Sequence, residues 1–125
     1  MEDSVSYEQA KRLKELGFDW KTHAWYNTHG ELWTKCPQAY PAPTLAQVQK
    51  WLREVKEIFV YAHISVGPRV KGKHYWIITS KDGEVLDSIP FVKLFQLFDS
   101  YEQALSAGID KALEILKQQS NGNKA

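Results

Sequence analysis

Tryptophan, tyrosine and histidine side chains are concentrated in one short segment, WKTHAWYNTHGELW, at residues 20–33. Its fourteen positions hold three tryptophans, one tyrosine and two histidines. Histidine can ligate a metal ion or act as a general base, and tryptophan can line a binding surface. The segment therefore suggests a metal site or a ligand surface, besides the simpler interpretation of a hairpin with large side chains.

A metal site would need three or four converging ligands, and zinc sites that are visible in a sequence usually contain close ligand pairs. This chain has no such pair. If Val66 pairs with Lys73 in the later hairpin, a site built from His23, His63 and His74 is conceivable. Because the ligand spacing is missing, we expect histidines on a partly exposed sheet face, with no metal and no cofactor.

The single cysteine, Cys36, offers the other possible reaction chemistry, since a cysteine beside a histidine can act as a nucleophile. Cys36 shares its predicted side of the strand with Leu32, which faces the core, and free cysteine is among the most buried residue types. We therefore expect an inert thiol. The segment GPRVKGK also lacks the Ser or Thr and the following helix of a phosphate-binding loop, so the sequence assigns no catalytic residue.

The aromatic segment itself is predicted to be a hairpin of two strands. The strand FDWKTHAWY, residues 18–26, alternates between a core face and an outer face. Matching the apolar faces of this strand and the returning one places Tyr26 opposite Leu32. Trp25 then faces Trp33, and such an aromatic pair stabilises strand pairing by about 0.5–1.5 kcal/mol.

One kind of N-terminal motif, the capping box, predicts three helices. In this motif a Ser or Thr is followed three residues later by Gln. The motifs SYEQ, TLAQ and SYEQ predict helix starts near residues 7, 45 and 101. The first helix should end near residue 16, before Gly17. We expect one domain over residues 1–117 and a disordered polar tail over residues 118–125.

Between the second and third helices the apolar residues recur at every second position, as in strands. Residues 58–66 and HYWIITS form two strands, and Lys81-Asp82-Gly83 turns into a short third strand at residues 84–87. Residues 90–98 fit neither the helical nor the strand period well, so a short helix and an edge strand both stay open. The predicted fold is α+β, with a mostly antiparallel sheet of four or five strands and about three helices packed on one face.

Two helical segments resemble known sequences: PTLAQVQKWLRE at residues 43–54 and FDSYEQALSAGIDKALEIL at residues 98–116. They are similar to small uncharacterised proteins from phage-like and mobile regions of gut Bacteroidetes genomes. That group has no established activity, so the resemblance implies no catalytic residue. It implies a bacterial or phage setting in the cytoplasm.

The outer face of the predicted sheet is the first candidate binding surface, because an aromatic patch of this size is seldom left bare on a monomer. It should meet a protein partner or a second copy of the chain, unless residues 90–98 cover it. Its predicted members are Trp25, Trp33, Phe59, Tyr61, His63 and Trp76.

A basic hairpin loop is the second candidate surface, since no acidic residue occurs from Ile58 to Ser80. The loop carries Arg69, Lys71, Lys73 and His74 beside two further aromatic residues, a combination that suits a phosphate backbone and stacked bases. We therefore expect a non-enzymatic binding or adaptor protein. A nucleic-acid-binding protein is the alternative, and a small hydrolase or metal enzyme comes third.

Composition agrees with a cytoplasmic setting. The chain has 125 residues, 43% of them hydrophobic, and a net charge of +1. Because Met1-Glu2-Asp3 lacks the basic region and apolar run of a signal peptide, we expect none. The sequence has no apolar run of about 18 residues that could span a membrane and no second cysteine for a disulfide. Residues 32–81 hold eight basic and two acidic groups, and we expect the acidic flanks to offset this positive charge.

Overall fold

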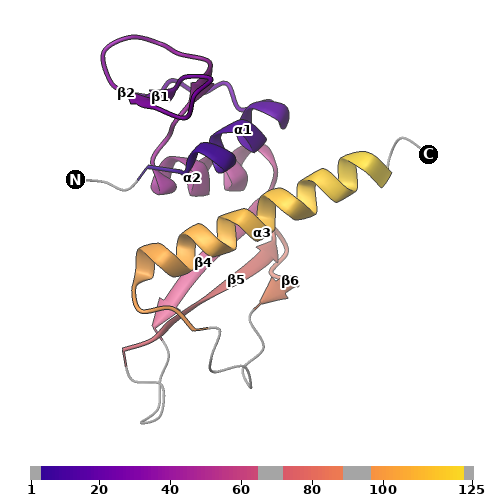
Figure 1. Ribbon diagram of the computed structural model, residues 1–125. Helices are drawn as coiled ribbons and strands as arrows, with labels where there is room; N and C mark the ends of the chain where they lie inside the picture. The colour runs from indigo at the N-terminus through magenta and orange to yellow at the C-terminus, as the bar shows by residue number, and fades with distance from the viewer. Residues whose placement is uncertain (1–3, 65–71, 89–96, 123–125) are drawn as a thin grey trace. The chain divides into compact units, whose positions relative to one another are not determined.

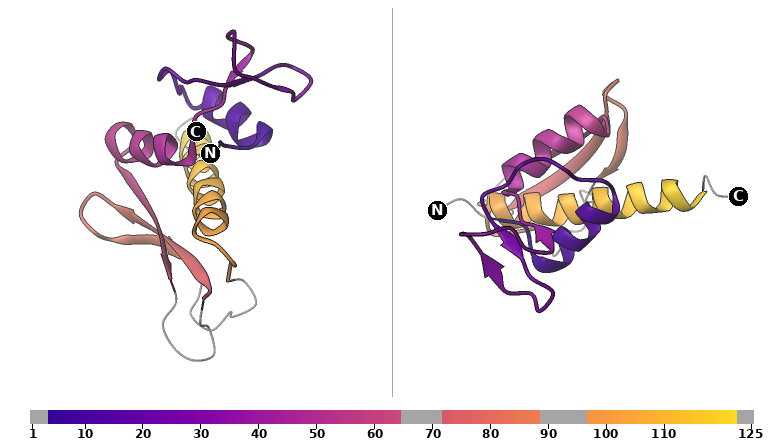
Figure 2. Two further views of the ribbon diagram at one scale, coloured as in Figure 1. Left: turned by 90° about the vertical axis from the view of Figure 1, so that its left-hand side faces the viewer. Right: turned by 90° about the horizontal axis from the view of Figure 1, so that it is seen from above.

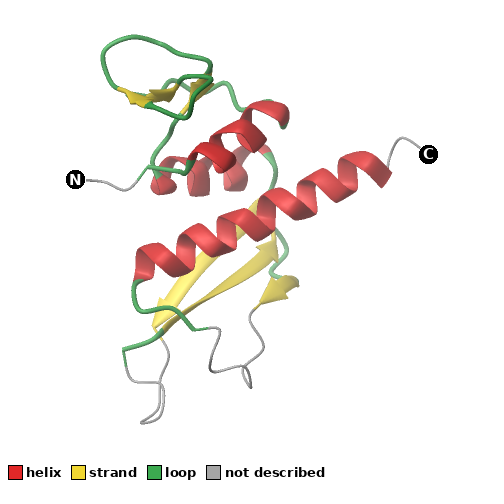
Figure 3. Ribbon diagram, viewed as in Figure 1, coloured by secondary structure: helices red, strands yellow, loops and turns green. Residues whose placement is uncertain are grey.

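The computed structural model describes residues 4–64, 72–88 and 97–122 (Figure 1). Each of the first two helices is followed by three antiparallel strands, and a third helix ends the described chain (Figure 3). In chain order the elements are α1 (Tyr7–Glu15), β1 (Trp25–Tyr26), β2 (Leu32–Trp33), β3 (Tyr40–Pro41), α2 (Leu45–Val55), β4 (Ile58–Ile64), β5 (His74–Ser80), β6 (Val85–Ser88) and α3 (Tyr101–Gly122).

The α+β class is confirmed, but the single sheet of four or five strands is wrong. Two three-stranded antiparallel sheets form instead, in the orders β2-β1-β3 and β4-β5-β6. The expected strand over residues 18–26 shortens to Trp25–Tyr26 because local hydrogen bonds occupy the chain before it. The amide of Phe18 donates to the carbonyl of Leu13, and the Thr22 hydroxyl donates to the carbonyl of Ala24.

All three predicted helix starts are confirmed, and the caps of α1 and α2 have the expected pair of hydrogen bonds. Ser6 accepts from the amide of Gln9, whose side chain accepts from the amide of Ser6. Thr44 and Gln47 form the same pair of bonds. At α3 the Ser100 hydroxyl accepts from the Gln103 amide, but the Gln103 side chain accepts from the amide of Asp99.

The end of α1 is also as expected from the sequence. Gly17 has a φ of +93°, a left-handed conformation that costs glycine little. The amide of Phe18 then reaches back to the carbonyl of Leu13 at 2.9 Å, and both side chains are buried. In α2 the expected apolar stripe stops one turn early, since Leu45, Val48 and Leu52 are buried whereas Val55 is exposed.

Chain contacts group the residues into two compact units, Met1–Val48 with Leu113–Ala125, and Gln49–Ala112. Whether they fold as the single domain expected for residues 1–117 stays a prediction. The helix α3 continues to Gly122 and thus extends into the segment 118–125 that was expected to be disordered.

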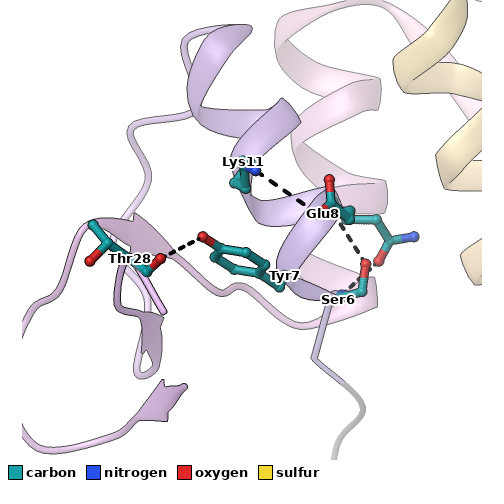
Figure 4. A network of polar contacts seen from close by, with 6 residues as sticks. Ser6, Tyr7, Glu8, Lys11 and Thr28 are labelled. Atoms are coloured by element: carbon teal, nitrogen blue, oxygen red, sulfur yellow. Dashed lines mark hydrogen bonds and ion pairs between the residues drawn. The ribbon is translucent and has the colours of Figure 1, made fainter. Parts of the chain in front are cut away.

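In the first unit Tyr7 joins α1 to the small sheet (Figure 4). Its hydroxyl donates to the carbonyl of Thr28 at 3.1 Å, and its ring meets the ring of Tyr26 edge to face. The Nζ atom of Lys11 lies 5.1 Å from the centre of the same ring. A methyl group at Gly30 would stand 3.4 Å from the Tyr7 ring, so this glycine allows the β1–β2 turn to lie close to it.

In the second unit β4, β5 and β6 form the predicted meander. The turn between β5 and β6 contains Gly83 at a φ of +84°, and the Gly83 amide donates to the carbonyl of Ser80. The pairing of β5 with β6 is irregular between Ile78 and Thr79, which marks a β-bulge. The first turns of α3 lie against one face of this sheet (Figures 1 and 2).

Candidate binding surface

The pairing of β4 with β5 decides which side chains share the face that α3 does not cover. Phe59 is opposite Thr79, Tyr61 is opposite Ile77, and His63 is opposite Tyr75. Directly opposed residues lie on the same face of a sheet. We call this surface the outer face and define it by these six residues.

The other face of the same sheet packs against α3. A Cβ atom at Gly108 would lie 2.9 Å from the Cγ1 atom of Val60 and 2.9 Å from the Cβ atom of Trp76. Only glycine permits so close an approach of the helix to the strands. Val60 and Ile78, which oppose each other, are buried on this side.

Four rings follow one another across the outer face. The ring centres of Phe59 and Tyr61 are 6.2 Å apart, those of Tyr61 and His63 are 6.0 Å apart, and those of His63 and Tyr75 are 5.7 Å apart. Tyr61 and His63 are exposed, while Phe59 and Tyr75 are half-buried. The rings thus form one partly exposed aromatic row with the hydroxyl and imidazole groups needed for polar contacts.

The prediction that Trp76 shares the outer face with His63 is wrong. The expected register paired Val66 with Lys73 and put His63 opposite Trp76. Instead, Ala62 is opposite Trp76, and Ile64 is opposite His74. A one-residue shift moves every side chain of a strand to the other face, so Trp76 and His74 lie on the side of α3, and Tyr75 takes the place expected for Trp76.

Trp25 and Trp33 are opposed, as predicted, and so are Tyr26 and Leu32. However, they belong to the sheet β2-β1-β3 of the first unit, so one continuous aromatic face with Phe59 and Tyr61 is not formed within a sheet. Trp33 is 43% exposed and Trp25 is half-buried.

The basic loop is described only at its C-terminal end, because Arg69 and Lys71 lie outside the described residues. Lys73 forms a hydrogen-bonded ion pair with Asp99. This bond, and then the charge of Lys73, lowers the pKa of the Asp99 carboxyl below its ordinary value. The charge of Lys73 is therefore matched within the chain.

His74 is held in place through its backbone. Its amide and carbonyl exchange hydrogen bonds with Phe98 at 2.7 and 2.9 Å, which places Phe98 beside the end of β5. The Nδ1 atom of His74 is buried and has no hydrogen-bond partner among the residues that the structure describes. Of the unassigned segment 90–98, the part before residue 97 lies outside the described ranges.

The histidines considered for a metal site do not converge. His63 and His74 lie on opposite faces of one sheet, as the register requires. Within residues 4–64, 72–88 and 97–122, no group of three His, Cys, Asp or Glu side chains is placed to hold a metal ion.

The expectation that Cys36 faces the core is wrong. Its side chain is exposed, and its Sγ atom accepts a hydrogen bond from Gln38 at 3.2 Å. The predicted return strand ends after Trp33, so alternation no longer governs the direction of Cys36.

Comparison with known proteins adds no further constraint. No protein-family model, curated protein or solved structure matches this chain. Among the described helices, none is both long and apolar enough to cross a membrane.

The strand alternation identified Phe59, Tyr61 and His63, but sequence reasoning missed Tyr75, Ile77 and Thr79. The signal that could have found them is the register, which depends on the length of the loop between β4 and β5. Their alternation was visible, but the side they face was not.

Proposed function

We propose that the chain is a non-enzymatic binding or adaptor protein that holds a protein partner on the outer face of the sheet β4-β5-β6. The observation that carries this proposal is the row of four rings from Phe59 to Tyr75, with spacings of 5.7 to 6.2 Å. Tyrosine and other aromatic side chains supply large contact areas and lose little conformational entropy on binding. They are also enriched among residues that dominate binding energy.

The geometry of the unit supports a prearranged surface. Gly108 lets α3 approach the opposite side of the sheet closely, so the strands that carry the rings are backed by packed side chains. A rigid support of this kind lowers the entropy cost of binding. Tyr61, which is 40% exposed, lies beside Phe59 and His63 and is the best single residue to test.

The alternative of a nucleic-acid-binding loop has less support, because Lys73 is already paired with Asp99. Binding of a polyanion depends on cations that can replace its counterions. Arg69 and Lys71 would have to supply that attraction.

The test compares two variants, Tyr61→Ser and Trp33→Ser. Trp33→Ser is the control because it removes a similarly exposed aromatic residue from the other sheet. Binding is measured by capture of partners from a bacterial lysate and then with the purified proteins. We expect Tyr61→Ser to weaken binding at least about tenfold, the scale of a hot-spot residue, and Trp33→Ser to leave it unchanged. If Trp33→Ser weakened binding and Tyr61→Ser did not, the binding surface would lie on the β1–β2 hairpin.

The same preparation should be applied to a polyanion column. Retention that falls with salt, and that is lost when Arg69, Lys71 and Lys73 are replaced by Ala, would favour nucleic acid over a protein partner.

A further inference from the structure

The strand β4 has one free edge. Among the described strands it pairs only with β5, so it ends the order β4-β5-β6. A free edge presents unpaired amide and carbonyl groups that can bond to another strand.

The hydrogen bond of Gln49 identifies the residues whose backbone groups point to this edge. Its Nε2 atom donates to the carbonyl oxygen of Val60 at 2.7 Å. In an antiparallel strand the amide and carbonyl of one residue point to the same edge, and the edge alternates with each residue. Ala62 and Ile64 therefore direct their backbone groups to the same side as Val60. In this segment Tyr61, His63 and Ile64 are exposed and Ala62 is half-buried.

Within the described residues, β4 lacks the usual protections of an edge strand, apart from the Gln49 side chain that occupies the Val60 carbonyl. Natural edges are protected by charged residues, proline, bulges or short length, whereas IFVYAHI has seven residues without a charged side chain or a proline. The opposite edge strand, β6, has only four residues, carries Asp87 and pairs through a bulge. The two edges of this sheet are thus unequal, and β4 is the one open to pairing.

We propose that the edge of β4 at Ala62 and Ile64 pairs antiparallel with the same strand of a second copy of the chain, about a twofold axis at His63. In this register Ala62 of each copy is opposite Ile64 of the other, so a small side chain meets a large one twice. Four backbone hydrogen bonds close the pair.

Two features favour a second copy in this register. β4 contains no Lys, Arg, Asp or Glu that would meet its like when the strand pairs with itself. A twofold axis at Ala62 would instead need the carbonyl of Val60, which already accepts from Gln49. The axis at His63 leaves that bond intact and covers Ile64, which is 58% exposed.

The dimer would join two outer faces into one six-stranded sheet with both aromatic rows on the same side. This inference concerns the edge of β4 and does not rest on the proposed function of the face. Loss of partner binding in Tyr61→Ser and loss of the dimer are separate results.

The first experiment measures molar mass by sedimentation equilibrium of the full chain from low to high micromolar concentration. We expect a monomer–dimer equilibrium that Ile64→Lys weakens by at least about tenfold, since pairing would desolvate the ammonium group. The control is Val85→Lys, because Val85 is 59% exposed on β6. A chain that stays monomeric, or equal losses in both variants, would overturn the proposal.

The second experiment tests the register by disulfide trapping in a Cys36→Ser background, with oxidised glutathione as the oxidant. The two His63→Cys sites would face each other across a closely spaced pair, within the range of about 4.4–6.8 Å between Cα atoms that a disulfide needs. The two Tyr61→Cys sites would be offset by about four residues, or about 13 Å. Rapid cross-linking of His63→Cys alone is expected.

A mixed disulfide between His63→Cys and Tyr61→Cys, with neither variant linking to itself, would place the axis at Ala62 and contradict the register. Unfolding curves of each variant serve as the check that the fold is retained.

Discussion

At the scale of single residues, the charge of Lys73 is paired with a carboxylate that is far away in the sequence. Asp99 accepts its hydrogen bond across a separation of 26 residues. The sequence shows Lys73 among the cations of a loop without acidic residues, which favoured a free positive charge. No local pattern announces the partner, because the bridge of His74 with Phe98 brings the two side chains together.

The Asp99 carboxyl should titrate below its ordinary pKa of 3.8, because Lys73 donates a hydrogen bond to its charged form and attracts it electrostatically. A lowered pKa in the folded state means that the pair stabilises the fold above the unfolded pKa and loses this effect as pH falls through the folded pKa. A carbon-13 NMR titration of Asp99 measures the midpoint. In Lys73→Met it should rise toward the ordinary value, and an unchanged midpoint would disprove the pairing in solution.

Tyr26 should show the opposite dependence at alkaline pH. Burial raises the pKa of its phenol above 10.0, and its hydroxyl donates to the carbonyl of Val5 at 2.7 Å. The stabilising effect is complete below the unfolded pKa and is lost as pH rises through the raised folded pKa. Unfolding of Tyr26→Phe should therefore depend less on pH in this range, and should cost about 1 kcal/mol at neutral pH from loss of the hydrogen bond. An unaltered pH slope would contradict this.

At the scale of elements, the sequence predicts the helices better than the sheets. Capping boxes are local, since both partners lie within four residues, so the starts at Tyr7, Leu45 and Tyr101 could be predicted. The register of β4 and β5 depends on a loop, and an error of one residue exchanged Trp76 for Tyr75 on the outer face. The outer strand residues of β4 were predicted correctly, while their partners were not.

The cap of α2 should have a measurable effect on stability. Thr44 accepts from the Gln47 amide at 3.1 Å, and its own amide donates to Gln47 at 3.0 Å. Replacing Thr44 by Ala removes the first bond and should cost about 1 kcal/mol in the free energy of unfolding. Thr34→Ala, which changes an exposed threonine outside the helices, is the control and should be near neutral. Equal unfolding midpoints for the two variants would disagree with the role of the cap.

The packing of α3 on β4 and β5 depends on a single missing methyl group. In Gly108→Ala the new Cβ atom would approach Val60 and Trp76 to 2.9 Å, which forces the helix or the strands to move. Overpacking of this kind costs about 1–3 kcal/mol, against a gain in helix propensity of about 1 kcal/mol. We expect a net loss in denaturant unfolding, reduced in a Val60→Ala background where one of the two contacts is relieved. A stabilised Gly108→Ala variant would contradict this packing.

At the scale of the whole molecule, two sheets form where the sequence predicted one. The reason is that the chain between α1 and α2 forms turns and two-residue strands in place of long strands. Asn27 accepts from the amides of His29 and Glu31 at 2.9 Å, which forms a compact turn between β1 and β2. Alternation in FDWKTHAWY suggested a longer strand, but alternation does not report such side-chain hydrogen bonds. The class of the fold could thus be predicted, whereas the number of sheets depended on tertiary detail.

The two units should nevertheless unfold in one transition, because each of two helices runs through both. The boundary at Val48 falls inside α2, and the boundary at Leu113 falls inside α3. Melting one unit would leave a fragment of each helix that is too short to persist alone, since isolated helices below about 12–15 residues are marginal in water.

We therefore expect coincident denaturation curves from far-ultraviolet circular dichroism and tryptophan fluorescence. Thr44→Ala changes the first unit and Gly108→Ala the second, so each should move both curves by the same amount. Two resolved transitions, each sensitive to one of these substitutions, would mean that the units are separate domains. In that case the row of rings on β4 and β5 could be studied apart from the tryptophans of β1 and β2.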